Sequence, residues 1–280
     1  MHPHLLGVDH VVILTDDLDA AQARWTRLGF NLTPRGFHSI GTRNHCMMLG
    51  NDYLELMSVA TPHPVTRYFS EFLAGGDGAG AIALATDDSD ACRQSLQASG
   101  IAADAPVDFS RPVETAGTTR DARFRVTQLP VTATPGCRTF LCQHFTPELV
   151  WLPPYQRHPL GVRGIAGVTM IVADRAAAVS AYARVAGIDP IEAAAAGTIR
   201  IGSFTIDFVE PSAATPLPAG IPLPARPAPV IGALHLRVDD VEVAARQLAA
   251  AGFQTRPLGE RAIALAGQTI NGTGLTFRET

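Results

Sequence analysis

GVDHVVILTDD, residues 7–17, carries the strongest structural signal in this 280-residue chain. It begins as an apolar strand that holds His10 near its start, and it ends at Asp17. Aspartate caps helices because its carboxylate accepts hydrogen bonds from the N–H groups of the first turn. The residues up to position 28 have the apolar spacing of a helix, and Gly29 then supplies a left-handed stop. The stretch therefore predicts a strand followed by a capped helix.

The same pattern occurs four times along the chain. In each copy an apolar run precedes an Asp, and a Gly follows that Asp after 12, 12, 13 or 12 residues. The pairs are Asp17 with Gly29, Asp88 with Gly100, Asp174 with Gly187, and Asp240 with Gly252. Short strand-like runs follow every Gly, and in the third copy they are residues 190–194, 198–201 and 204–210. The sequence predicts four βαβββ modules, whose spacing of 66 to 86 residues is too long for a solenoid and indicates modules in pairs.

A proline-rich segment, residues 151–159, separates the second copy from the third. We therefore expect two α+β domains of two modules each, residues 1–158 and 159–280. The chain is long enough for each half to bury its own core. Its 46% apolar and 17% charged residues are typical of a globular protein.

The composition also limits the partners of the protein. The net charge is −4 and no cluster of Lys or Arg stands out, which disfavours nucleic acids and anionic membranes. No apolar run reaches the ~20 residues that a membrane helix needs. Four cysteines without CxxC spacing, and the lack of a secretory leader, predict reduced core thiols in a cytoplasmic protein. The expected partner is a small molecule, and a homodimer is left open.

Several other chemistries lack their motifs. The chain has no Gly-x-Ser-x-Gly elbow, no phosphate-binding loop of the Gly-Lys-Ser/Thr kind and no dinucleotide fingerprint after its first strand. A hydrolase triad or a nucleotide-dependent enzyme is therefore disfavoured.

The modules and several short motifs resemble the vicinal oxygen chelate superfamily, and most closely its glyoxalase-like branch. The motifs lie within residues 1–160 and are DHVV (9–12), LGF (28–30), GTRN (41–44), YLEL (53–56) and CQHFTPELVW (142–151). The resemblance implies that paired modules curve around a cleft, where residues from the first and fourth strands of both modules bind a divalent ion. Relatives include lyases, isomerases, dioxygenases and antibiotic-binding proteins, so the resemblance predicts the fold more sharply than the activity.

Carried over onto this sequence, the resemblance assigns metal-ligand positions to His10 and Glu55. An imidazole and a carboxylate suit Fe, Mn, Ni, Co or Zn. A carboxylate between Leu54 and Leu56 would also be costly to bury unless a metal, an Arg or an exposed sheet face relieved it.

The second module departs from the family pattern. Its first-strand position is Ala81, which cannot bind a metal. In its fourth strand we predict His144 as the third ligand, with Glu148 as the reserve, because two histidines and one carboxylate leave open positions for substrate.

The second half of the chain keeps fewer ligand-type residues at the equivalent positions. Its first strands offer Gly167 and Ala233, and its fourth strands offer Asp207 and Thr276. We expect no metal there, a supporting or lid-like role for this half, and a structural role for His235.

Other polar residues are candidates for the cleft. His38 and His45 flank residues 41–44, a predicted turn at the cleft mouth, and either could move a proton at neutral pH or be a solvated loop residue. Arg43 and Asn44 could hold a substrate carboxylate or carbonyl, or only structure the loop. Tyr53 and Trp151 are expected to line the cleft and contact the substrate.

Two functions follow from these residues. The first is a metal-dependent lyase, isomerase or dioxygenase acting on a small oxygenated metabolite, with His10, Glu55 and His144 holding the ion. The alternative is a metal-free small-molecule binding or resistance-type protein on the same fold. In that case Phe37, Tyr53, Phe140 and Trp151 would line the cleft.

Overall fold

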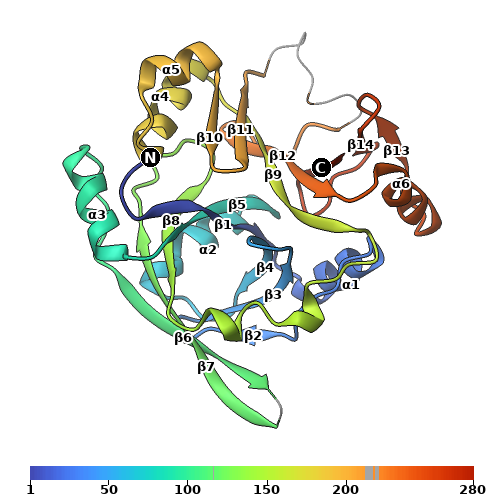
Figure 1. Ribbon diagram of the computed structural model, residues 1–280, viewed down its shortest axis with the longest axis horizontal. Helices are drawn as coiled ribbons and strands as arrows, with labels where there is room; N and C mark the ends of the chain where they lie inside the picture. The colour runs from blue at the N-terminus through green and yellow to red at the C-terminus, as the bar shows by residue number, and fades with distance from the viewer. Residues whose placement is uncertain (116, 212–216, 218–220) are drawn as a thin grey trace.

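The computed structural model describes residues 1–115, 117–211, 217 and 221–280, and it consists of two mixed β-sheets with helices packed around them (Figure 1). The first sheet has eight strands in the order β2-β3-β4-β1-β5-β8-β7-β6, and the second has seven in the order β10-β11-β9-β12-β15-β14-β13. The predicted α+β class with paired modules is thus confirmed. None of the described helices is long and apolar enough to cross a membrane.

The elements alternate in chain order. The first sheet comprises β1 (Leu5–Leu14), β2 (Gly36–Phe37), β3 (Thr42–Met48), β4 (Tyr53–Val59), β5 (Gly78–Thr86), β6 (Val107–Thr115), β7 (Thr118–Gln128) and β8 (Arg138–His144). The second comprises β9 (Val162–Ile171), β10 (Thr198–Ile201), β11 (Phe204–Val209), β12 (Val230–Val238), β13 (Thr255–Pro257), β14 (Ala262–Leu265) and β15 (Gly274–Glu279). The helices are α1 (Leu18–Arg27), α2 (Arg67–Leu73), α3 (Ser89–Ala98), α4 (Arg175–Ala186), α5 (Pro190–Ala196) and α6 (Val241–Ala250).

All four repeated helix caps form as predicted. The carboxylates of Asp17, Asp88, Asp174 and Asp240 each accept a hydrogen bond of 2.9 Å from a first-turn N–H group. The glycine beyond each helix has a positive φ, for example 66° at Gly187. The aspartates begin the α1, α3, α4 and α6 helices, and the glycines end them, at equivalent places.

The third module differs from the prediction. Residues 190–194 belong to helix α5 and not to a strand, because Asp189 caps the segment, Pro190 occupies its first turn and a run of alanines follows. The other three modules have the expected βαβββ order. The predicted turn at 41–44 is also wrong in part: Thr42 already begins β3, and the chain turns at His38, whose carbonyl accepts from Gly41 N–H at 3.0 Å.

The first sheet curls so far that its two edges approach each other. Ser39, just after β2, donates its N–H to the carbonyl oxygen of Ser110 in β6 at 3.0 Å. The sheet therefore has a concave inner face and a convex outer face. The alternation of side chains along β1 sends His10, Val12 and Leu14 inward and Val11 and Ile13 outward.

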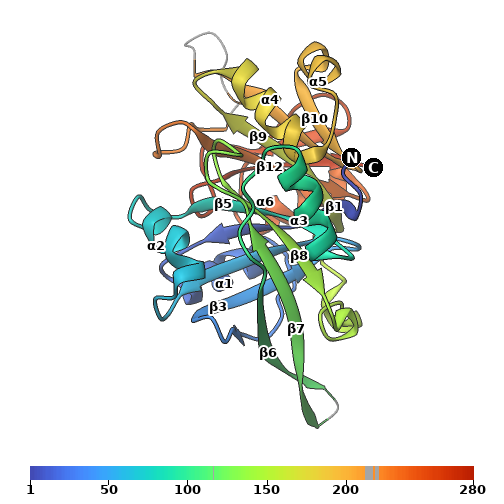
Figure 2. The same cartoon turned by 90° about the vertical axis from the view of Figure 1, so that its left-hand side faces the viewer.

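The convex face packs against the second sheet. Val11 and Ile82 share one core cluster with Ile165, Val168 and Leu234 of the second half. Figure 2 shows the strands of residues 162–280 stacked over those of the first sheet, with β6 and β7 extending away from the second half. The concave face is left to form a separate chamber.

Polar contacts connect the two halves at buried positions. Trp25 of α1 is fully buried, and its indole N–H donates to Asn271 Oδ1 at 3.1 Å. The amide of Asn271 in turn donates to Asp77 Oδ2 at 2.7 Å. Asn271 has a φ of 44°, a conformation that Asn tolerates better than most residues.

We predict that Asn271→Ala lowers the free energy of unfolding by roughly 2–3 kcal/mol, because it leaves the Trp25 N–H without an acceptor and places Ala at positive φ. Asn271→Gly also removes the acceptor, but Gly adopts a positive φ without strain, so this variant should lose less stability. Chemical denaturation of both variants measures the difference. Equal stability of the wild type and Asn271→Ala would show that this contact does not stabilise the packing of the halves.

Candidate functional site

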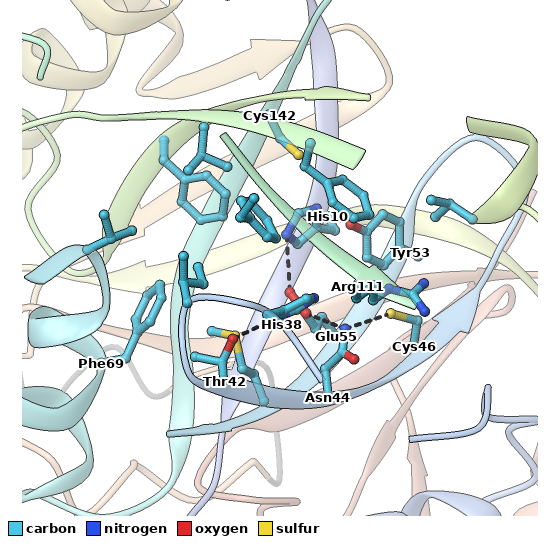
Figure 3. A pocket seen from close by; sticks show the side chains of 18 of the residues that line it. His10, His38, Thr42, Asn44, Cys46, Tyr53, Glu55, Phe69, Arg111 and Cys142 are labelled. Atoms are coloured by element: carbon cyan, nitrogen blue, oxygen red, sulfur yellow. Dashed lines mark hydrogen bonds and ion pairs between the residues drawn. The ribbon is translucent and has the colours of Figure 1, made fainter. Parts of the chain in front are cut away.

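The concave face of the first sheet encloses the candidate site. Its space is about 570 Å³, the open mouth included. Most of the wall is apolar or aromatic, including Tyr53, Phe69, Phe109, Phe124, Val126, Phe140 and Val150. Polar or charged side chains also line it, including His10, His38, Thr42, Asn44, Glu55, Arg111 and Gln128 (Figure 3). A small apolar molecule with a few polar groups suits such a chamber.

A β-bulge at the start of β1 brings two neighbouring residues together. Across β1 and β5, Val8 pairs with Leu84 but His10 pairs with Ala83, so Asp9 is an extra residue in the ladder. Regular alternation would send Asp9 and His10 to opposite faces. The bulge instead allows Asp9 Oδ2 to lie 2.6 Å from His10 Nδ1.

The other nitrogen of His10 faces Glu55. His10 Nε2 and Glu55 Oε2 are 3.4 Å apart, and both side chains are nearly fully buried. Glu55 also accepts a hydrogen bond of 2.7 Å from the side-chain amide of Asn44. Tyr53 stacks on the His10 ring with centroids 4.3 Å apart. Each member of the pair is therefore oriented by a further residue, as Figure 3 shows for Glu55 and Asn44.

The two carboxylates keep His10 protonated. Burial by itself lowers the pKa of His10, but the hydrogen bonds and charges of Asp9 and Glu55 outweigh it and raise the pKa to about 9. Burial raises the pKa of Glu55, yet the imidazolium and the Asn44 amide bring it below its ordinary value. At neutral pH the pair is an imidazolium beside a carboxylate.

His144 lies on the other side of His10 from Glu55. Its Nε2 is 3.0 Å from Asp9 Oδ2 and its Nδ1 is buried without a hydrogen-bond partner among the described residues. Ligand atoms of Asp9, Cys142 and His144 lie within 4.8 Å of one another, so this group could hold a metal ion. Burial keeps the pKa of the Cys142 thiol well above its ordinary value, so the thiol is protonated without an ion.

A common ion for His10, Glu55 and His144 stays a prediction. Glu55 lies beside Nε2 of His10. His144 instead contacts Asp9, and Asp9 lies beside Nδ1 of the same His10 ring. The first-strand position of the second module, Ala81, contributes only a methyl group to the inner face.

The register also identifies the second-module counterpart of Glu55. Val12 pairs with Glu55 across β1 and β4, and Ala83, which occupies the same place in β5, pairs with Phe140 of β8. The equivalent of Glu55 is thus Phe140 and not His144. Two of the four positions that the family resemblance assigns to the metal therefore carry no ligand atom.

Other predicted residues have different surroundings. His38 lines the chamber and donates to or accepts from Thr42 Oγ1 at 2.7 Å, and burial lowers its pKa to about 4. His45 lies on the opposite face of β3, where its Nδ1 is 2.8 Å from the carbonyl oxygen of Thr33. Arg43 is exposed and sits over the ring of Phe37, which is itself half exposed.

Trp151 and Glu148 are not among the described residues that line the chamber. Trp151 packs against His144 with ring centroids 4.9 Å apart and also contacts Tyr53. Glu148, the reserve ligand, is exposed and pairs with Arg120 at 3.0 Å.

In the second half, the surroundings of Gly167 and His235 differ from those of the ligand positions in the first half. A side chain at Gly167 would collide with the backbone of Thr205 in the neighbouring strand. His235 is buried between the hydroxyl groups of Thr169 and Thr276, at 2.8 and 2.7 Å.

Sequence reasoning missed Asp9 and Arg111. Asp9 was hidden because strict alternation places it away from His10, and only the bulge reverses that. Arg111 lies in β6, far from the quoted motifs, and becomes part of the site because the sheet curls. An Asp directly before a strand His is a usable signal, whereas nothing local marks Arg111.

Comparison with known proteins agrees with this architecture. Residues 8–186 match the model of the glyoxalase-like domain family, and the chain belongs to this family. None of the curated proteins compared with this sequence matches it. The resemblance seen in the motifs is thereby confirmed.

Three solved structures share the fold along the whole chain. A hypothetical protein from Staphylococcus aureus has 13% identity and a TM-score of 0.64, with 98% of this chain and 99% of the other covered. A triple-substitution variant of 4-hydroxymandelate synthase from Streptomyces coelicolor has 14% identity and a TM-score of 0.63, covering 100% and 93%. A xylose isomerase-like TIM barrel/4-hydroxyphenylpyruvate dioxygenase fusion protein has 12% identity and a TM-score of 0.59, covering 100% and 49%. At these identities the likeness is one of fold.

We predict that the stability of metal-free protein falls as the pH rises from about 6.5 to about 9. The pKa of His10 is raised from 6.5 to about 9 by folding, so the folded state binds one more proton than the unfolded state within that window. The loss should reach roughly 3 kcal/mol by pH 9. Denaturation in the presence of a chelator at several pH values measures it.

Glu55→Gln removes one of the two carboxylates beside His10 and should reduce this slope. A slope that is equal in the variant and the wild type would contradict the assignment of the proton to His10.

Proposed function

We propose that this protein is an enzyme that moves a proton within a small oxygenated molecule, with His10 and Glu55 as the reacting pair. The observation that carries the proposal is the buried pair itself: Nε2 and Oε2 lie 3.4 Å apart on the wall of an otherwise apolar chamber. Buried, oppositely charged groups with shifted pKa values concentrate at active sites. Lyase-type and isomerase-type reactions both begin with such a proton transfer.

His10 is suited to stabilise negative charge on a substrate oxygen. Its Nδ1–H is held by Asp9, so its Nε2–H points at Glu55 and toward the chamber. A carbonyl oxygen bound there would accept this hydrogen bond, and an enolate developing on it would be stabilised by the imidazolium. Asp9 orients the ring in the way that carboxylates orient catalytic histidines.

Glu55 is suited to take the proton from carbon. When the substrate oxygen takes the His10 hydrogen bond, Glu55 loses part of its ion pair while staying buried, and its pKa rises. The C–H electron pair moves into the enolate as the proton passes to Glu55. Exchange is complete when the carboxyl of Glu55 swaps this proton for one from solvent and delivers it to the same carbon. Isomerisation of an α-hydroxycarbonyl compound is complete when the proton passes to the carbonyl carbon and the hydroxyl proton moves to the former carbonyl oxygen, with no net change in atoms or electrons.

A metal-assisted reaction is the second candidate, favoured by the group formed by Asp9, Cys142 and His144 beside His10. A divalent ion there, or between His10 and Glu55 as the sequence predicts, would act as a Lewis acid toward a substrate oxygen. Neither set has the four protein positions that the family resemblance assigns to the metal.

We predict that the protein catalyses exchange of C–H protons next to a carbonyl in D₂O. Acetoin, dihydroxyacetone and 2-oxobutanoate are suitable probes, and ¹H NMR measures the loss of their C–H signals. Glu55→Gln should slow the exchange roughly 100-fold or more, because an amide cannot act as the base. Glu71→Gln makes the same chemical change on exposed helix α2 and should leave the rate unchanged.

Exchange that persists in Glu55→Gln would exclude Glu55 as the base. If the wild type exchanges none of the three probes, the proton-transfer function is wrong, and the metal-free binding alternative becomes the better description.

We further predict that metal content, measured by elemental analysis of protein purified without chelators, separates the two candidate ion sites. An ion between His10 and Glu55 should be lost in Glu55→Gln and kept in Cys142→Ser. An ion on the other group should show the reverse. A metal content of the wild type below about one-tenth of an ion per chain would contradict both candidate sites.

A further inference from the structure

Arg111 in β6 is a buried cation without a partner in the protein. The residue is 6% exposed. Within the described residues its side chain has no hydrogen bond, no ion pair and no aromatic ring beneath it, whereas Arg125 has all three kinds of contact. None of its guanidinium nitrogens is among the fully buried side-chain atoms without a partner, so its five N–H donors keep some open space beside them in which a ligand can bind.

The neighbouring acids are already engaged. Glu55 on the chamber wall and Asp9 behind His10 are buried carboxylates, and each contacts His10. Glu55 also accepts from Asn44. Neither carboxylate is therefore free to neutralise Arg111.

Gly36 leaves room for the Arg111 side chain. A Cβ at Gly36 in β2 would lie 3.1 Å from Arg111 Cδ and would collide with the side-chain oxygen of Asn44. The absence of a side chain at Gly36 thus leaves room for both residues over β2. Figure 3 shows Arg111, Asn44 and Cys46 at the same end of the chamber, next to Glu55.

The charge of Arg111 acts on the chamber interior. Burial raises the pKa of the Cys46 thiol, and the positive charge of Arg111 opposes this rise. Burial lowers the pKa of His38, and the charge of Arg111 lowers it further. Both of those side chains line the chamber, as Arg111 does. A ligand in the chamber is therefore within reach of the guanidinium.

We propose that Arg111 binds the carboxylate of the small molecule that occupies the chamber. The planar guanidinium matches a carboxylate with two parallel hydrogen bonds. The apolar body of the ligand would lie against Phe109, Phe124 and Phe140. This inference rests on the proposed small-molecule function and adds its substrate class: carboxylic acids with an apolar or aromatic body.

A carboxylate fits the chamber better than a phosphate. Arg111 is the one chamber cation in the described structure that has no carboxylate within ion-pair distance, so it balances a single negative charge. A phosphate group carries about two charges at neutral pH and needs more donors than one guanidinium provides. Other donors on the wall, such as Thr42, Asn44 and Gln128, are neutral, so they do not balance a second negative charge.

Binding of simple probes tests the proposal without any turnover. Benzoate and phenylacetate are compared with benzamide and phenylacetamide, which keep shape and size but lose the charge. Inorganic phosphate is the anion control. Thermal shift and calorimetric titration in a buffer free of carboxylates measure binding to the wild type, Arg111→Met, Arg111→Lys and Arg120→Met, whose target lies exposed on β7.

The acids should stabilise the wild type and Arg120→Met, while the amides and phosphate should not. Arg111→Met should weaken benzoate binding roughly 10- to 100-fold, and Arg111→Lys should keep part of the affinity, because it retains the charge without the planar fork. Equal binding of acids and amides, equal binding by Arg111→Met, stronger binding of phosphate, or no binding of either acid would each overturn the proposal.

The ligand-free variants give a second readout. If Arg111 awaits a ligand, Arg111→Met removes a largely buried side chain whose charge has no ion-pair partner among the described residues, and the variant should melt at the same temperature as the wild type or higher. A large drop in its melting temperature would show that Arg111 serves the fold. Neither the binding titrations nor the melting temperatures measure turnover. Both results therefore stand even if His10 and Glu55 catalyse no C–H exchange.

Discussion

The imidazole of His10 between the carboxylates of Asp9 and Glu55 is the contact on which the rest of the site depends. Three buried ionisable groups can coexist there because they share protons and hydrogen bonds. The extra residue in β1 makes this arrangement possible, since it turns two consecutive side chains toward one another. Asn44, Tyr53 and His144 then pack around this pair and complete its hydrogen bonds and stacking.

The curvature of the first sheet turns this contact into a site. Strands from both modules of the first half supply the wall, and the approach of β2 to β6 narrows the space. The second sheet supports the convex side through a shared core, and none of the described residues that line the chamber comes from it. The copies have thus diverged: one module carries the ionisable pair, and its partner presents Ala81 and Phe140 at the equivalent places.

Much of the fold was predictable because its signals are local. An Asp that caps a helix and a Gly that ends it act within a few residues, so all four helices could be located from spacing alone. The third module was harder, because PIEAAAA, residues 190–196, contains an apolar pair but is governed by its cap and its alanines. The pairing of His10 with Glu55 was implied by the family resemblance of the motifs. The other partners of these two residues were not, because a bulge changes the register by a single position.

The resemblance of its motifs to a known family implied His10 and Glu55, while the sequence by itself determined the α+β class and the paired modules. The sequence could do so because periodicity, helix caps and strand alternation are properties of short segments. Only the tertiary structure decided that Asp9 contacts His10, that Phe140 and not His144 is the counterpart of Glu55, and that Arg111 enters the chamber. The first two facts depend on a strand register that a single residue changes. The third depends on the closing of a curved sheet, which brings β6 to the chamber although no local pattern marks Arg111.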